Sequence, residues 1–289
     1  MTRVYAALAV GVIAVSFAAI FIRIAQAPPL VIATYRMCLT SLVLLPVAWA
    51  RSREELSGLS KGEIFTALLA GVFLALHFGV WIASLSYTSV ATSVVLVTIN
   101  PIFVAIASWL LFGEPFQRRA ILGILICLGG GMIIAYANWR AGITPLFGGL
   151  LALLGALAMA GYLLIGRRLR QKVGLLSYAC LVYSSAGLLL LLATLALGYS
   201  LFGYSAGTYA MLVLLALVPQ LLGHSLLNWS LRFVSATLVT IAILGEPVGA
   251  TVWAWLILGE APNPAEVAGG VLILAGIFVA LHRRDAPVL

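Results

Sequence analysis

The sequence predicts an all-α membrane protein, with ten transmembrane helices arranged as two inverted five-helix repeats. Three observations predict this class: an apolar composition, ten apolar segments of spanning length, and a pattern that recurs half a chain later. Of the 289 residues, 64% are hydrophobic and 8% are charged, whereas soluble domains carry about 25% charged residues. Lipid or neighbouring helices must therefore surround most side chains.

A helix needs about 20 apolar residues to cross a bilayer. Segments of this kind lie at 4–23, 30–50, 64–86, 89–112, 119–137, 148–166, 175–199, 207–229, 236–258 and 265–282. Short loops rich in charge, proline or glycine separate them, for example residues 51–55 and 167–172. Ala25-Gln26-Ala27 resembles a signal-peptide cleavage site, but the length of the first segment and its apolar counterpart near 150–168 favour a membrane helix.

The second half of the chain repeats the first with a constant step of 146 residues. The recurring positions are Pro101, Trp109 to Glu114 and Gly123, which become Pro247, Trp255 to Glu260 and Gly269. We therefore divide the chain into residues 1–145 and 146–289. Because five is an odd number of crossings, the two repeats are expected to run in opposite directions through the membrane. Inverted repeats of this kind commonly enclose the substrate site of a secondary transporter.

The basic residues fall almost entirely in alternate loops, which predicts an orientation. With the N-terminus in the cytoplasm, the inner side holds Arg3, Arg51, Arg53, Lys61, Arg118, Arg119, Arg167, Arg168, Arg170, Lys172, Arg232, Arg283 and Arg284. The outer side then holds Arg23 and Arg140. We expect a protein of the inner (plasma) membrane with both termini in the cytoplasm.

Charge and cysteine usage narrow the expected partners. The net charge is +8, but the basic residues lie in short breaks between apolar segments, so we expect no nucleic-acid partner. Cys38, Cys127 and Cys180 lie inside apolar segments and are expected to pack as small hydrophobic residues. We expect no metal and no cofactor. The partners are a small-molecule substrate and the lipid bilayer, and the protein is a monomer or a homodimer.

The repeated pattern resembles the EamA-like branch of the drug/metabolite transporter superfamily. The residues that carry the resemblance are Tyr35-Arg36, Asn100-Pro101, Gly113-Glu114-Pro115, Gly129 to Gly131, Glu246-Pro247, Gly259-Glu260, Gly269-Gly270 and Gly276. The second repeat departs from it, with Ala261 after Glu260 and no Tyr-Arg pair. The resemblance implies transport through a central cavity, with segments 119–137 and 265–282 peripheral or at a dimer face. It leaves amino acids, other metabolites and drugs open as substrates.

Two polar stripes identify the expected wall of that cavity. His77, Trp81 and Ser84 follow one another at helical spacing, and Gln220, His224 and Asn228 do the same in the corresponding segment of the second repeat. Polar side chains within a span usually face the bundle interior or a wet cavity. We predict that both stripes bind substrate. The alternative is that each histidine bonds a neighbouring helix and serves packing alone.

Two proline sites, Asn100-Pro101 and Glu246-Pro247, occupy equivalent positions in the two repeats. A proline inside a helix frees a carbonyl group and kinks the axis, so Pro101 and Pro247 are predicted hinges. Asn100 is predicted to contact the amino or carboxyl group of a substrate, and Glu246 to bind an amino group or carry a coupling proton. Alternatively, Glu246 pairs with an arginine or caps a broken helix.

Two further predictions concern residues without a counterpart in the other repeat. Arg36, about two turns inside its segment, is predicted to bind a carboxylate, although its long side chain can also reach the interface by snorkelling. Tyr162, one turn from Met159, is predicted to form an aromatic wall of the cavity. Lipid exposure or core packing is the alternative for that pair.

Together these features favour a secondary transporter that exports small polar or amphipathic metabolites, with amino acids as the favoured and broad substrate class. Phosphorylated substrates would need a central cluster of basic residues, and Arg36 is the one candidate. A multidrug exporter for lipophilic cations is the near alternative. An intramembrane enzyme is the distant one, because the sequence holds a single aspartate, Asp285, and no protease or hydrolase motif. We expect no catalytic residue.

Overall fold

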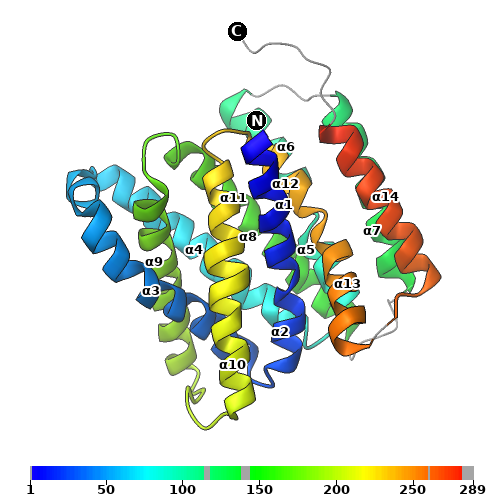
Figure 1. Ribbon diagram of the computed structural model, residues 1–289, viewed down its shortest axis with the longest axis horizontal. Coiled ribbons are helices and arrows are strands. Elements are labelled where there is room, and N and C mark those ends of the chain that lie inside the picture. The colour runs from blue at the N-terminus through cyan, green and yellow to red at the C-terminus, as the bar shows by residue number, and fades with distance from the viewer. Residues whose placement is uncertain (1, 114–117, 138–143, 260, 282–289) are drawn as a thin grey trace.

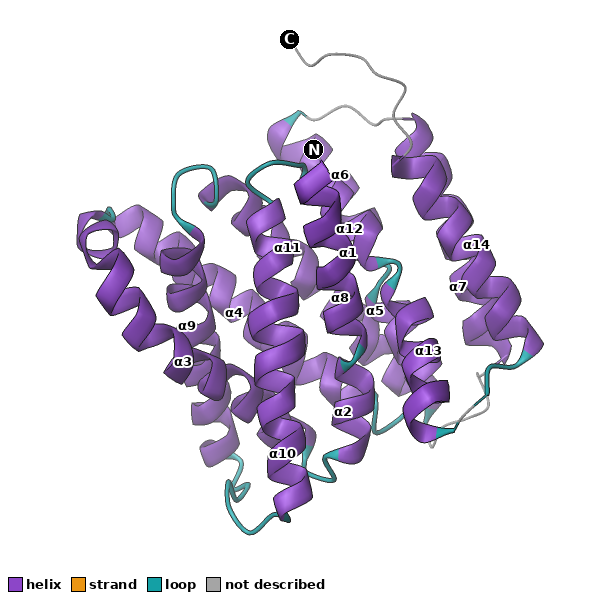
Figure 2. Cartoon of the chain, viewed as in Figure 1, coloured by secondary structure: helices purple, strands orange, loops and turns teal. Residues whose placement is uncertain are grey.

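The computed structural model of the chain describes residues 2–113, 118–137, 144–259 and 261–281. Glu114, Glu260 and Arg140, which entered the sequence predictions, lie outside these ranges. Within them every regular element is a helix (Figure 2). The helices are α1 (Thr2–Ser16), α2 (Ala18–Ile24), α3 (Pro29–Gly58), α4 (Lys61–Ser84), α5 (Val90–Val97), α6 (Asn100–Phe112), α7 (Arg118–Ala137), α8 (Pro145–Leu169), α9 (Leu175–Ala196), α10 (Ala206–Leu215), η1 (Ala216–His224), α11 (Ser225–Ser230), α12 (Ala236–Ile243), α13 (Glu246–Leu258) and α14 (Pro264–Leu281).

Each predicted membrane segment corresponds to one helix or to a run of consecutive short helices. In the described chain, 9 such stretches are long and apolar enough to cross a membrane, and a shorter apolar helix, Pro264–Ala280, follows them. The predicted class of an all-α membrane protein with ten helices is therefore confirmed.

One boundary prediction is wrong. Residues 51–55 were expected to form a loop, but α3 continues to Gly58 after a local break at Ser52, where φ is −136° and ψ is 18°. The continuation has a tertiary cause, because the Glu55 carboxylate accepts hydrogen bonds at the start of α9. A charged stretch therefore extends the helix beyond its apolar part.

Three membrane-crossing stretches are broken near their middle. One break falls at Phe17, whose ring stacks on Trp253 of α13 at a centroid distance of 4.1 Å. The other two separate α5 from α6 and α12 from α13, directly before the Asn100-Pro101 and Glu246-Pro247 pairs. Proline is tolerated there because the first N–H groups of a helix have no intrahelical partner. Each proline site therefore starts a half-helix inside the protein.

Helices of the first half of the chain pack on the corresponding helices of the second half. Helix α3 packs on α9, and α7 packs on α14. Helix α4 packs on α8, and in the same way α1 packs on η1 and α11. The two broken stretches cross so that α5 contacts α13 and α6 contacts α12. Helices α1 and α14 reach the same end of the bundle at Thr2 and Leu281, here called the N-terminal face (Figure 1).

Helices α7 and α14 form a pair at one edge of the bundle (Figure 1). Their backbones approach closely at glycines: a Cβ atom on Gly130 would lie 2.5 Å from the Gly269 carbonyl oxygen, and one on Gly269 would lie equally close to the Gly130 oxygen. Small residues commonly permit such packing between membrane helices. The resemblance implied that these two segments are peripheral, and the structure places them at the edge of the bundle.

Replacing Gly130 with alanine is expected to lower the free energy of unfolding by about 1–3 kcal/mol, because the added methyl group forces α7 and α14 apart. The neighbouring Gly129 provides the matched control, since a Cβ atom there meets nothing within 4 Å. Thermal unfolding of the two purified alanine variants in detergent measures the difference. Equal stability of the two variants would contradict the close approach.

Candidate functional site

A small cavity lies at the centre of the bundle, next to the starts of the two half-helices α6 and α13. Its volume is about 20 Å³, enough for about one water molecule. Residues predicted to bind substrate form its polar wall: Arg36, His77, Trp81, Asn100, His224 and Glu246. Apolar side chains complete the lining, among them Val15, Ala18, Val97, Met159, Leu227 and Ile243.

Arg36 is the largest charged group at this cavity. Its side chain is 1% exposed, so it does not snorkel to the interface. Its Nε atom donates to Oε1 of Gln220 at 2.9 Å, and its guanidinium carbon lies 4.0 Å from the centre of the Phe78 ring. Gln220 is therefore a partner of Arg36 rather than part of the cavity lining.

Glu246 is the acidic residue of the cavity lining. It is the first residue of α13 and is 9% exposed, and a carboxylate is favourable at the positive end of a helix dipole. Glu246 and Arg36 line the same cavity without forming a direct ion pair. Asn100, at the equivalent first position of α6, is 2% exposed, and its Oδ1 atom has no hydrogen-bond partner among the described residues.

The two histidines face the cavity from α4 and η1. His77 Nδ1 lies 2.9 Å from the carbonyl oxygen of Gly155, which can only accept, so the proton is on Nδ1 and Nε2 of the neutral ring is an acceptor. The His77 ring stacks on Trp81 at 5.8 Å, and the His224 ring meets Phe78 edge-on at 5.4 Å. One histidine thus bonds a neighbouring helix and still lines the cavity.

Other predicted site residues lie behind the cavity wall. Asn228 Nδ2 donates to the hydroxyl oxygens of Tyr162 at 2.5 Å and Tyr183 at 3.0 Å. Ser84 donates to the Trp81 carbonyl at 2.6 Å and shares a 2.5 Å hydrogen bond with Ser93 of α5. These residues do not line the cavity, and their buried positions exclude the lipid-facing alternative for Tyr162.

Two features of the site were not predicted from the sequence. Tyr183 of α9 is fully buried and bonds to Asn228 beneath the cavity. The Ala216–His224 stretch is a π-helix that contains Pro219. Because proline has no N–H group, the α-helical ladder is interrupted there, and π-helical turns frequently occur at functional sites.

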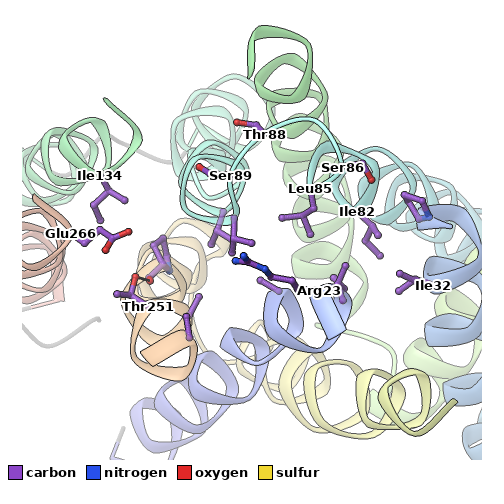
Figure 3. Close-up of a pocket in the computed structure, with 18 of the residues that line it drawn as sticks. Arg23, Ile32, Ile82, Leu85, Ser86, Thr88, Ser89, Ile134, Thr251 and Glu266 are labelled. Carbon is purple, nitrogen blue, oxygen red and sulfur yellow. Dashed lines mark hydrogen bonds between the residues drawn. The ribbon is translucent and has the colours of Figure 1, made fainter. Parts of the chain in front are cut away.

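A much larger vestibule of about 730 Å³ lies beyond the central cavity, at the face opposite the N-terminal face. Residues from the ends of α2 and α4, from α13 and from the start of α14 line it. Figure 3 shows Arg23 extending into this space, with Thr251 and Glu266 to one side and Leu85 and Ile82 to the other.

About one helical turn separates the vestibule from the central cavity. On α3 the vestibule residue Ile32 lies four positions from Arg36, and on α13 Ala250 lies four positions from Glu246. Directly after α4, Leu85 is likewise four positions from Trp81. Since one turn rises about 5.4 Å, the two spaces lie close together along these helices.

The N-terminal face is tied together by Arg170, which is 1% exposed. Its Nε atom donates to the Asn228 carbonyl at 3.2 Å, and its guanidinium also donates to the Val173 carbonyl. Burial, together with the positive charge of Arg232, lowers the pKa of this guanidinium. The contacts hold the loop after α8 against the end of α11.

Glu55 makes a second connection at this face. Its carboxylate accepts from the backbone N–H of Gly174 at 2.6 Å and from the hydroxyl of Ser177. The extension of α3 therefore caps the first turn of α9 across the two halves of the chain.

Replacing Arg170 with alanine is expected to reduce stability by about 2–3 kcal/mol, because two charge-assisted hydrogen bonds to carbonyl groups are lost. The exposed Arg168, two residues earlier, is the matched control and is expected to change stability by less than about 0.5 kcal/mol. Thermal unfolding checks both values. An Arg170 variant as stable as the Arg168 variant would show that this face is held by other contacts.

A multi-pass helical membrane protein with broken helices around a central polar cavity, and with a vestibule on one side, has the architecture of a secondary transporter. The sequence profile of the EamA-like transporter family matches residues 2–136 and again residues 146–281. The chain belongs to this family and is a membrane transporter.

Similar proteins include exporters. The Pseudopaline exporter CntI of Pseudomonas aeruginosa is 28% identical over 236 residues, which cover 80% of this chain and 79% of that protein. A Streptantibioticus cattleyicolor protein named "Probable terminal-alkyne amino-acid exporter" is 25% identical over 193 residues, which cover 67% and 64%. A protein of known crystal structure, 18% identical, shares the fold with a TM-score of 0.79 over 97% of each chain.

Proposed function

We propose that this transporter exports small polar or amphipathic metabolites, with amino acids as its main and broad substrate class, by alternating access to the central cavity. Residues 1–145 and 146–289 act as two inverted repeats in this mechanism. The helix contacts between the two halves support the inversion, above all the antiparallel crossing of α5–α6 with α12–α13. The similar exporters named above support the direction and the substrate class.

The observation that carries the proposal is that a guanidinium group, Arg36, and a carboxyl group, Glu246, line one buried cavity. A charged group within a membrane span is costly unless it is paired or functional. A zwitterionic substrate offers one group of each sign to this pair. Apolar lining residues such as Met159 and Leu227 surround the substrate side chain once the cavity has widened from its present volume of about 20 Å³.

The proposed orientation places both termini in the cytoplasm of a cell whose inner (plasma) membrane holds the protein. Helices begin or end at the N-terminal face with basic residues such as Arg3, Lys61, Arg118, Arg168 and Arg232, as the distribution rule for cytoplasmic loops predicts. The vestibule then opens to the outside, and about one helical turn separates it from the central cavity.

Flux into proteoliposomes containing the purified protein tests the proposal. A panel of labelled amino acids is measured with and without a pH gradient, against liposomes without protein. Saturable flux that unlabelled amino acids compete for is expected, and the gradient comparison shows whether protons are coupled. No flux of any amino acid would overturn the substrate class.

The second candidate is export of lipophilic cations. The aromatic rings of Trp81 and Phe78 near the cavity favour it, because cations bind to aromatic faces, and Glu246 supplies a negative charge. Repeating the flux measurements with lipophilic cations distinguishes the two candidates. Flux of cations without flux of amino acids would establish the second.

Alanine at His77, Trp81 or Asn100 is expected to reduce transport by about tenfold or more, since one lost hydrogen bond to a charged group corresponds to roughly 1.5–3 kcal/mol. Leu76 on α4, with 53% exposure, is the control position, where alanine is expected to leave flux unchanged. Flux is normalised to the amount of inserted protein. Full activity in all three cavity variants would remove the cavity from the mechanism.

A further inference from the structure

Several buried polar atoms at the central cavity have no hydrogen-bond partner, and their chemistry indicates which ligand could bind to them. Among the described residues, four polar atoms of the cavity lining are buried and make no hydrogen bond within the protein: Arg36 Nη1, Trp81 Nε1, Asn100 Oδ1 and His224 Nδ1. Most buried polar side-chain atoms in folded proteins have a partner, so a cluster around one cavity requires an explanation.

Water alone does not account for the cluster. The cavity holds about 20 Å³, which corresponds to about one water molecule making roughly three hydrogen bonds. Four unpartnered lining atoms, together with the Glu246 carboxyl group, exceed what one water satisfies. A ligand with several polar atoms of its own fits the set better.

The unpartnered atoms include two chemically different kinds. The N–H groups of Arg36 and Trp81 can only donate, and they come from α3 and α4. The Asn100 Oδ1 atom can only accept, as can the Glu246 carboxylate when it is ionised, and both residues start half-helices. The His224 Nδ1 atom donates or accepts according to the tautomer of its ring. Donors fixed around a site favour an anion, and acceptors favour an ammonium group.

We infer that the central cavity, once it has widened to join the vestibule, binds a zwitterion in one orientation, with its carboxylate at Arg36 and Trp81 and its ammonium group at Asn100 and Glu246. The inference rests on the proposed function and deepens it, because it limits the main substrates to compounds with both groups close together. Val97, Met159 and Leu227 leave the substrate side chain an apolar environment. Neutral amino acids with apolar side chains meet all three requirements.

Gln220 acts in this arrangement as a positioning residue. Its Oε1 atom accepts from Nε of Arg36 at 2.9 Å, so one edge of the guanidinium is held by the protein while Nη1 stays unpartnered. A lipophilic cation would leave the donors of Arg36 and Trp81 unsatisfied, and an unpaired buried donor is costly.

The test compares how three compounds inhibit exchange of labelled L-leucine in proteoliposomes. Unlabelled leucine carries both charged groups, leucinamide lacks the carboxylate, and N-acetyl-leucine lacks the ammonium group. For the unchanged protein each blocked compound is expected to inhibit about 10- to 100-fold more weakly than leucine, since each loses hydrogen bonds to charged groups.

Two variants are expected to change the pattern in opposite ways. Arg36→Gln lowers the preference for leucine over leucinamide and keeps the preference over N-acetyl-leucine, and Glu246→Gln does the reverse. Trp81→Phe keeps an aromatic ring and removes one donor. It is expected to lower the preference for leucine over leucinamide by a smaller factor than Arg36→Gln, and it replaces that variant in the test if Arg36→Gln does not fold.

Three results would overturn the inference. Leucine exchange that all three compounds inhibit equally would leave the proposed function intact and reject the zwitterion site. Variants that change all three inhibition constants by the same factor would assign Arg36 and Glu246 to packing. The absence of any amino-acid exchange would reject both the inference and the proposed function.

Discussion

Arg36→Gln is expected to destabilise the protein by about 3–5 kcal/mol and to reduce leucine transport by about tenfold or more. Its removal leaves the Glu246 carboxylate buried without an opposite charge, and breaking one side of a buried pair has a cost of this size. It also leaves Oε1 of Gln220 without its donor. Thermal unfolding measures the first effect and proteoliposome flux the second.

The double variant Arg36→Gln/Glu246→Gln separates structure from function. Removing both charges is expected to restore most of the stability, because two neutral amides replace the pair, but leucine transport stays low since no charged group binds either end of a zwitterion. Arg53→Gln is the matched control: Arg53 lies on the same helix, is exposed, and covers the Trp49 ring at 4.7 Å. Normal transport by the double variant would show that the pair is structural only.

Pro247→Ala is expected to slow transport strongly while substrate binding is retained. Proline disfavours a continuous helix by about 3 kcal/mol, and an alanine N–H at this position can donate to the Ile243 carbonyl four residues earlier. The helix then gains continuity across the break between α12 and α13, with a bias on the order of 100-fold. If the break is a hinge, the exchange between conformations becomes rare.

Pro101→Ala at the equivalent break between α5 and α6 is expected to have the same effect. Pro46→Ala is the control, because Pro46 lies inside α3 on the exposed side and away from the cavity. Initial transport rates and substrate affinity are measured for all three. Unchanged rates in the Pro101 and Pro247 variants would remove the hinge role from both prolines.

The helical segments were predictable because their length and hydropathy are those of membrane-crossing helices. Segment ends in apolar loops agree within a few residues with the structure, for example 236–258 with α12 and α13. The end of α3 was not predictable, since the charged residues after Ser52 stay helical only through contacts that Glu55 makes with α9.

The candidate site was predictable in part. Helical spacing placed His77 and Trp81 at the cavity, but Ser84 stands at the end of α4 and bonds to α5 instead. Tyr183 carries no polar periodicity along α9, and its role depends on Asn228, which is distant in sequence. The two stripes also are not equivalent residue by residue, because the 146-residue step relates His224 to Phe78, whose ring it contacts.

The measurement that tests the central claim most directly is substrate protection of a cysteine in the central cavity. In a background without Cys38, Cys127 and Cys180, Met159→Cys places a thiol on the cavity lining, and Thr251→Cys places one in the vestibule. The alkylation rate of each thiol is measured with and without saturating L-leucine. We expect leucine to slow alkylation at position 159 and to leave the rate at position 251 unchanged. Leucine transport accompanied by protection at position 251 but not at position 159 would contradict substrate binding in the central cavity.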